Sequence, residues 1–367
     1  MLFIFGPYCV SLGRQMGGGR VKLESVTIDD VAAAAGVSRQ TVSRVINRRP
    51  NVKDAVRARV QQAVDRLGYV PNLSARRMGG ARSYLILAVN DRQRTLENWQ
   101  AGRGNDWVDQ MLYGGMTECE RNGYHLVFEL IDTAPEKAES ALAAILSALR
   151  PDGVILTPPH SDNPRLAALL ADRSIACARV GHRDGKGCVD VYMNEEGAAH
   201  AATAHLIGLG HRALAFVAGS QSYGNSARRL AGFRQAIADA GLPAESGIVG
   251  TGDFKFDSAV AAIEEMLAAP HRPTAIIADN DEMAFAALHV ADQHDLRVPH
   301  DLSVISFEDT PGVRFSVPPL TAVRQPTAEM IAKACERLIA ISAGADNGGS
   351  FEIPYALIER ASTVSPE

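Results

Sequence analysis

The sequence predicts a small all-α headpiece followed by a larger α/β core, in which two subdomains each hold a parallel sheet with helices on both faces. Three observations lead to this fold class. Apolar residues recur at helical spacing between residues 28 and 67. From residue 83 onward, apolar runs typical of buried strands alternate with helical stretches, which is the rhythm of βαβ units. The length of 367 residues also exceeds that of one ordinary domain.

Residues 1–24 are expected to be an extra N-terminal tail that is disordered. Its apolar run covers about twelve residues, whereas a membrane span needs about 20. The run also lacks the basic start and the small-residue cleavage site of a signal peptide. No membrane partner is expected.

Residues 25–70 are predicted to form a helix-turn-helix domain. The first helix carries its apolar residues on one face. Thr27 can cap the start of this helix, with an acidic residue three positions on, and Gly36 can end it in a left-handed conformation. A second helix begins after Ser38, which is another capping residue.

The second helix presents the side chains that are expected to read DNA. Its inward face is apolar, and its outward face carries long or polar side chains that can reach base edges and phosphates in a major groove. Arg39 and Gln40 are expected to read bases, and Arg44 to contact a base or a phosphate. The DNA-contacting residues predicted in this domain are Thr27, Ser38, Arg39, Gln40, Thr41, Ser43, Arg44 and Asn47.

The distribution of charge supports this interpretation. Residues 21–82 hold 12 Lys and Arg against 5 Asp and Glu, whereas residues 83–367 carry a net charge of −14. A basic head on an acidic body is typical of a chain in which one part meets phosphate and the other does not.

No metal site, cofactor or catalytic centre is predicted. The five cysteines are odd in number and scattered, which favours reduced thiols, and neither they nor the histidines have the spacing of metal ligands. The sequence also lacks a GxSxG motif, a phosphate-binding loop and a dinucleotide-binding glycine motif after a strand. These absences argue against an enzyme.

A series of motifs runs through the first 82 residues. The motif AGVSRQTVSRVIN is followed by a third helix that ends at Gly68, and then by YVPN and LSARRMGG. In this order they resemble the DNA-binding headpiece of the lactose-repressor (LacI/GalR) family. The resemblance implies that residues 71–82 are a hinge that orders only on operator DNA, where two copies insert an apolar side chain into the minor groove. It implies further DNA contacts for Asn72, Arg76 and Met78.

The core carries its own landmarks, RPDGVILTPP, LGHRALAFVAG, RLAGFRQAIADAGL, ADNDEMAFAAL and DLSVISFEDT. They resemble the family's effector-binding core over residues 83–367, which is shaped like a periplasmic sugar-binding protein with the ligand between two subdomains. The N-subdomain is expected at about 83–192 and 326–345, and the C-subdomain at about 193–325 and 346–367. Helices are predicted at 108–122, 135–149, 195–208, 226–240, 257–269 and 282–295.

Ligand-binding residues are expected where strands end toward the cleft. The resemblance assigns the main effector contact to Arg229, whose forked guanidinium can grip two hydroxyls, and a second hydroxyl contact to Asn280. Glu308 stands where the family commonly has Asp, a departure that bears on the identity of the ligand. The other predicted effector-binding residues are Asn90, Trp107, Arg179, Tyr192 and Gln325.

The stretch between Val89 and Trp107 is expected to be a long polar loop, longer than its equivalent in relatives. It holds both tryptophans of the chain. Two interpretations stay open: Trp99 or Trp107 stacks on a sugar ring or covers the pocket, or both tryptophans pack locally on the surface.

These features predict a transcriptional regulator, in the first place a repressor, that responds to a small ligand. A homodimer would place two recognition helices on a pseudo-palindromic double-stranded operator. A sugar or sugar phosphate that acts as an inducer is the favoured effector. The alternative is a co-repressed regulator that responds to a purine nucleobase, and a solute-binding protein is disfavoured by the basic headpiece. The expected location is the bacterial cytoplasm, in association with the nucleoid.

Overall fold

The computed structural model describes residues 26–46, 52–69, 82–185, 187–346 and 348–366. The chain divides near residue 80 into a headpiece unit and a core unit. The predicted tail and nearly all of the predicted hinge lie outside the described residues, as do four of the predicted DNA contacts: Asn47, Asn72, Arg76 and Met78. Within the described ranges, no helix is both long and apolar enough to cross a bilayer.

The headpiece is built from helices α1 (Ile28–Ala35), α2 (Arg39–Ile46) and α3 (Asp54–Leu67). Their apolar faces meet in a small core, because residues three or four apart on a helix share one face. The buried side chains at its centre are Val31, Ala35, Val42, Val45, Val60 and Ala63.

The ends of the first two helices form as the sequence predicts. The backbone N–H of Thr27 donates to Asp30 Oδ2 at 2.8 Å, and the N–H of Asp30 donates to Thr27 Oγ1 at 3.3 Å, which completes a capping box. Gly36 ends α1 with φ at 62°, a left-handed conformation that glycine adopts without strain. The N–H of Thr41 donates to Ser38 Oγ at 3.2 Å, which caps α2.

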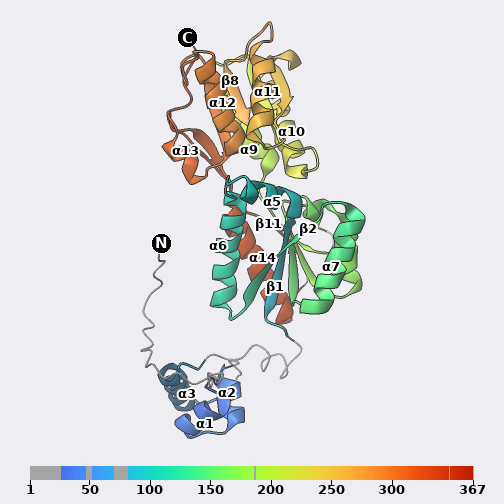
Figure 1. Cartoon of the computed structure of the whole chain (residues 1–367), viewed down its shortest axis with the longest axis vertical. Helices are drawn as coiled ribbons and strands as arrows, with labels where there is room; N and C mark the ends of the chain where they lie inside the picture. The colour runs from blue at the N-terminus through green and yellow to red at the C-terminus, as the bar shows by residue number, and fades with distance from the viewer. Residues whose placement is uncertain (1–25, 47–51, 70–81, 186, 347, 367) are drawn as a thin grey trace, which may run out of the picture. The chain divides into compact units, whose positions relative to one another are not determined.

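The core consists of two lobes, each built on one sheet (Figure 1). The sheet of the first lobe is parallel, with the order β11-β5-β4-β3-β1-β2. Its strands are β1 (Leu85–Asp91), β2 (His125–Ile131), β3 (Gly153–Leu156), β4 (Ala176–Val180), β5 (Val189–Tyr192) and β11 (Ser350–Glu352).

The sheet of the second lobe has the order β12-β10-β9-β8-β6-β7 and is parallel except for β12 at its edge. Its strands are β6 (Leu214–Ala218), β7 (Gly247–Thr251), β8 (Ala275–Ala278), β9 (Ser303–Glu308), β10 (Thr321–Arg324) and β12 (Ala356–Ile358).

Helices cover both faces of each sheet. The first lobe carries α6 (Asp106–Arg121), α7 (Pro135–Leu149), α8 (Pro164–Asp172) and α14 (Thr327–Ser342). The second lobe carries α9 (Glu195–Leu209), α10 (Gly224–Asp239), α11 (Phe256–Leu267), α12 (Asp281–Gln293) and the short α13 (Pro311–Phe315). The six helices predicted from the sequence correspond to α6, α7, α9, α10, α11 and α12.

The alternation of side chains along the strands explains this layering. Ile86 and Ala88 of β1 pack in the cluster formed with α6 and α14, whereas Leu87 and Val89 pack in the cluster formed with α7 and α8. Successive residues of a strand point to opposite faces, so a run that is apolar at every position needs helices on both sides.

The last crossover between the lobes lies further along the chain than the expected boundary at 346. The strand β11 (Ser350–Glu352) pairs with β5 and therefore belongs to the first lobe, and the chain crosses to the second lobe only before β12. A three-residue edge strand with exposed ends leaves no apolar run in the sequence, which is why it was missed.

The expectation of a long loop between Val89 and Trp107 was wrong. Residues Arg92–Gln100 form a helix, α5, which lies at the junction of the two lobes (Figure 1). Asp91 caps its start by accepting from the N–H of Arg94 at 3.1 Å. Only Thr95 is buried in this helix, so its sequence has no apolar face that would have predicted it.

Candidate functional site

A cavity of about 600 Å³ lies between the two lobes of the core. It is bounded by Asn90 at the end of β1, Asn280 two residues after β8, Glu308 at the end of β9 and Gln325 after β10. These are carboxyl ends of parallel strands, where α/β sheets commonly bind ligands. The volume lies within the range of small-molecule sites, about 300–1,000 Å³.

The cavity brings together most of the effector-binding residues predicted from the sequence. Those that line it are Asn90, Trp107, Arg229, Asn280, Glu308 and Gln325. Of the two tryptophans, Trp107 lines the cavity, whereas Trp99 is outside its lining and 46% exposed.

Two residues predicted to bind the effector, Arg179 and Tyr192, lie outside the lining of the cavity. Arg179 is buried inside the first lobe, where its Nε donates to Asp190 Oδ1 at 2.9 Å and its guanidinium also pairs with Asp184. A buried arginine must be paired, and these carboxylates already satisfy it. Tyr192 ends β5 near this cluster, with the Arg183 guanidinium 5.8 Å from its ring centre.

Arg229 is the most constrained side chain of the site. It is 1% exposed on α10, and its Nε donates to Glu195 Oε2 at 2.6 Å while its Nη1 donates to Asp279 Oδ1 at 2.8 Å. The guanidinium carbon lies 4.5 Å from the centre of the Phe307 ring. Burial disfavours its charge, but the two carboxylates outweigh this and raise the pKa of Arg229, which therefore stays charged.

Asn280 and Asn90 line the cavity but also hold the backbone around it. The Oδ1 of Asn280 accepts from the N–H of Met283 at 2.9 Å and so caps α12, and its Nδ2 donates to the Phe254 carbonyl at 3.3 Å. The Nδ2 of Asn90 donates to Thr95 Oγ1 at 3.0 Å. Each amide therefore has limited capacity left for a ligand.

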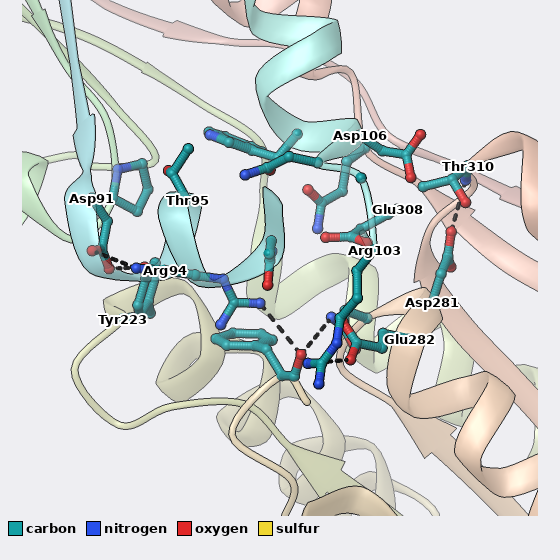
Figure 2. A pocket seen from close by; sticks show the side chains of 18 of the residues that line it. Asp91, Arg94, Thr95, Arg103, Asp106, Tyr223, Asp281, Glu282, Glu308 and Thr310 are labelled. Carbon is teal, nitrogen blue, oxygen red and sulfur yellow. Dashed lines mark hydrogen bonds and ion pairs between the residues drawn. The ribbon is translucent and has the colours of Figure 1, made fainter. Parts of the chain in front are cut away.

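Glu308 and Asp281 form an acidic pair on the second-lobe wall of the cavity (Figure 2). Burial, followed by the nearby charge of Asp281, raises the pKa of Glu308 to about 8. Burial also raises the pKa of Asp281 to about 7, although its Oδ2 accepts from the N–H of Thr310 at 2.7 Å. At neutral pH this part of the wall can thus both donate and accept hydrogen bonds.

The backbone at Glu308 is strained, with φ at 105° for a residue that has a side chain. The next residue, Asp309, is buried and anchors the turn by accepting from Arg324 Nε at 2.9 Å and from Arg360. Strain of this kind persists only where the surroundings over-determine the conformation, and it is common at ligand sites.

The Glu308→Gln variant is expected to gain stability over the wild type as the pH rises. A glutamate titrates near pH ~4.3 in an unfolded chain but only at about 8 here, so the folded wild type loses stability between these two values. Glutamine cannot ionise and escapes this loss. Urea unfolding should show that the stability of Glu308→Gln relative to the wild type increases by about 4 kcal/mol between about pH 5 and about pH 9. A difference independent of pH would contradict a protonated Glu308.

The cavity also contains residues that the sequence did not point to. Asn225 lines it, and its Oδ1 is buried without a hydrogen-bond partner in the described part of the chain. An unpaired buried acceptor costs about 1–3 kcal/mol, so a ligand hydroxyl that donates to it would be favoured. Asn225 lies four residues before Arg229 on α10, and this helical spacing on one face is the signal that could have found it.

In the headpiece, α2 presents the described DNA-contact candidates on the side opposite its buried valines. Arg39, Gln40 and Arg44 are exposed, and Thr41 and Ser43 are half-buried. The Nη1 of Arg39 lies 3.6 Å from Asp29 Oδ2. The hydroxyls of Thr27 and Ser38 cap helices, so they help to position α1 and α2.

The chain joins a helix-turn-helix, whose second helix is polar and exposed, to a two-lobed core with a cavity between the lobes. This combination defines a DNA-binding regulator that responds to a ligand. Two family models match the chain: "Bacterial regulatory proteins, lacI family" over residues 27–72 and "Periplasmic binding protein-like domain" over residues 203–363. The HTH-type transcriptional regulator CelR of Thermobifida fusca is 33% identical over 319 residues, which cover 85% of this chain and 90% of that protein. The chain therefore belongs to the LacI family of bacterial transcriptional regulators.

Solved structures agree with this assignment. The similarity to the structure of a CelR–cellobiose complex covers 92% of this chain and 99% of the CelR chain, with 31% sequence identity and a TM-score of 0.69. The lac repressor dimer bound to operator and the anti-inducer ONPF covers 93% of this chain and 100% of its own, with 27% identity and a TM-score of 0.75. The protein is thus a DNA-binding transcriptional regulator and not an enzyme.

Proposed function

We propose that the protein is a dimeric repressor whose operator affinity is lowered by an uncharged sugar in the cavity between the lobes. The observation that carries this proposal is the lining itself. It combines planar amides, an arginine fork and carboxyl groups with the aromatic faces of Trp107 and Phe285. Such a set can hydrogen-bond vicinal hydroxyls and cover the C–H surface of a sugar ring.

The arginines of the lining argue for a neutral sugar over a sugar phosphate. Arg229 is held by Glu195 and Asp279, and Arg103 pairs with Glu282 at 3.1 Å. Arg94 donates to the Phe254 carbonyl at 3.4 Å and stacks on the Phe254 ring. Carboxylates therefore match the charges of Arg229 and Arg103, and Arg94 alone would hold a phosphate weakly, whereas a dedicated site grips it with several charge-assisted hydrogen bonds.

The DNA side of the proposal rests on α2. In the proposal, Arg39 and Gln40 reach base edges, Arg44 reaches a base or a phosphate, and Ser38, Thr41, Ser43 and Thr27 position the backbone; Arg39, Gln40 and Arg44 are exposed. Asn47, Asn72, Arg76 and Met78 complete the proposed contact set from the ends of the helix-turn-helix and from the hinge. A dimer would present two copies of α2 to a pseudo-palindromic operator on the bacterial nucleoid.

Rotation of the lobes connects the two activities. A ligand that contacts both walls of the cavity binds best to one arrangement of the lobes and shifts the population toward it. In the proposed mechanism, this arrangement spaces the two headpieces of the dimer unfavourably for the operator.

Isothermal titration calorimetry on the full-length protein tests the proposed ligand class. The panel contains glucose, cellobiose, glucose 6-phosphate and hypoxanthine. The expected result is saturable binding of an uncharged sugar and none of the phosphate ester. Saturable binding of the purine alone would establish the alternative, a nucleobase-responsive regulator, and binding of the phosphate ester alone would overturn the charge argument.

A further inference from the structure

We propose that Arg103 is a positioning residue that fixes which sugar the cavity accepts. It holds the segment 92–107 against the second lobe, so that this segment forms the first-lobe wall of the cavity. The inference rests on the proposed function, because the ligand that it selects is the proposed effector.

The first-lobe wall of the cavity is almost entirely one continuous segment. Ten of the residues that line the cavity lie between Asn90 and Trp107, whereas the rest of the first lobe contributes only Pro158. The sheet beneath therefore has little direct contact with the cavity. Whatever fixes the position of the segment also fixes the shape of the site.

Apolar packing does little for the segment before Trp107, which is itself partly buried against the apolar core. Only Thr95 of α5 is buried, and a helix of nine residues is not stable by itself. The turn that follows, from Ala101 to Asn105, contains two glycines in the left-handed conformation. Polar contacts therefore do most to keep the helix and the turn in place.

Those contacts cross the cavity to the second lobe (Figure 2). Arg103 Nη1 lies 3.1 Å from Glu282 Oε1, and its Nη2 lies 3.9 Å from Asp257 Oδ2. At the other end of the segment, the hydroxyl of Tyr223 donates to Asp91 Oδ2 at 2.6 Å. Arg94 and Glu97 also contact the second lobe, through the Phe254 carbonyl and Lys255 respectively.

Arg103 meets the second lobe directly beside proposed ligand groups of that lobe. Glu282 is in the first turn of α12, next to Asp281 and Asn280, which line the cavity. The same Glu282 Oε1 also accepts from the N–H of Phe256 at 2.9 Å, so it is fixed within its own lobe. Arg103 thereby sets the distance between this wall and the adjacent Asn105, Asp106 and Trp107.

This arrangement predicts which ligands lose affinity when the contact is broken. A sugar that reaches from the second-lobe wall to the wall near Trp107 depends on the position of the segment. A smaller sugar that stays with Arg229 and Asn280 does not. We therefore expect Arg103 to favour cellobiose, a disaccharide of two glucose units, over glucose itself.

Hydrogen–deuterium exchange on the ligand-free protein tests the mechanical part of the inference without any ligand. In Arg103→Ala, amides of residues 92–107 should exchange about fivefold faster than in the wild type, as expected for loss of a half-exposed ion pair. Glu282→Gln should show the same increase, and the double variant no further one. Arg121→Ala is the matched control, because it removes an exposed arginine of the same lobe that pairs with Glu118. Unchanged exchange in Arg103→Ala would overturn the inference.

Calorimetry with cellobiose and glucose tests the selectivity. The expected result is that Arg103→Ala weakens cellobiose binding about fivefold and leaves glucose binding and operator binding unchanged. Equal weakening of both sugars would show that Arg103 supports the whole site, and would overturn its role in selection. If the wild type binds neither sugar while the exchange data are as expected, the proposed effector is wrong but the role of Arg103 in holding the segment stands.

Discussion

Arg229→Ala is expected to abolish the response to the effector while leaving operator binding in place. The variant leaves Glu195 and Asp279 buried without their common cation. Loss of one partner from such a network destabilises a fold by about 3–5 kcal/mol, and it weakens a ligand that used the same group by about 100-fold or more. Urea unfolding and operator binding at increasing sugar concentration measure the two effects.

Two further variants separate the loss of ligand contacts from the loss of stability. Arg229→Lys keeps the positive charge but not the fork, so it should recover part of the stability and little of the sugar response. Arg234→Ala removes an exposed arginine from the same helix and should change neither. A folded Arg229→Ala protein that still responds at wild-type sugar concentrations would contradict the location of the site.

Arg44→Ala is expected to weaken specific operator binding by about 10–100-fold and to relax the preference among operator variants. This is the cost of losing one good base contact, about 1–3 kcal/mol. The side chain is exposed on α2 and contributes nothing to the buried core of the headpiece, so the fold should be retained. Fluorescence anisotropy with the operator measures the loss of affinity, and the same titration with mutated half-sites measures the loss of selectivity.

The control for Arg44 is Arg66→Ala, which removes one exposed arginine from α3 of the same headpiece. A change in charge alone should weaken binding to specific and to non-specific DNA about equally, and should reduce the salt dependence of the affinity. If Arg44→Ala behaves like Arg66→Ala, the recognition-helix assignment for Arg44 is wrong.

The parts of the fold with strong periodic signals could be predicted from the sequence. The helix ends at Gly36 and Gly68 follow from the left-handed conformation that glycine permits, and both are observed. Strands such as β6 and β8 could be predicted because they are apolar at every position, which requires helices on both faces. The helix α5 and the strand β11 carry no such pattern, since tertiary contacts and edge pairing hold them.

The candidate site could be predicted where a residue lies at or close to the carboxyl end of a buried strand. Asn280 and Glu308 are in such positions, and the topology of the sheet brings them to the same cavity. Arg179 also ends a strand, but its side chain turns into the first lobe to meet Asp190, which strand position alone does not reveal. Arg103 was missed because its partners lie about 150 residues or more away in the sequence and meet it only in the folded core.

The most direct test of the central claim is fluorescence anisotropy of the full-length protein on DNA from upstream of its own gene, at fixed salt. The titration is repeated with each uncharged sugar that binds in calorimetry. We predict tight binding to this DNA that is lost when one such sugar saturates the cavity. Tight binding that every cavity-binding sugar leaves unchanged would contradict the proposal that the cavity controls the affinity for the operator.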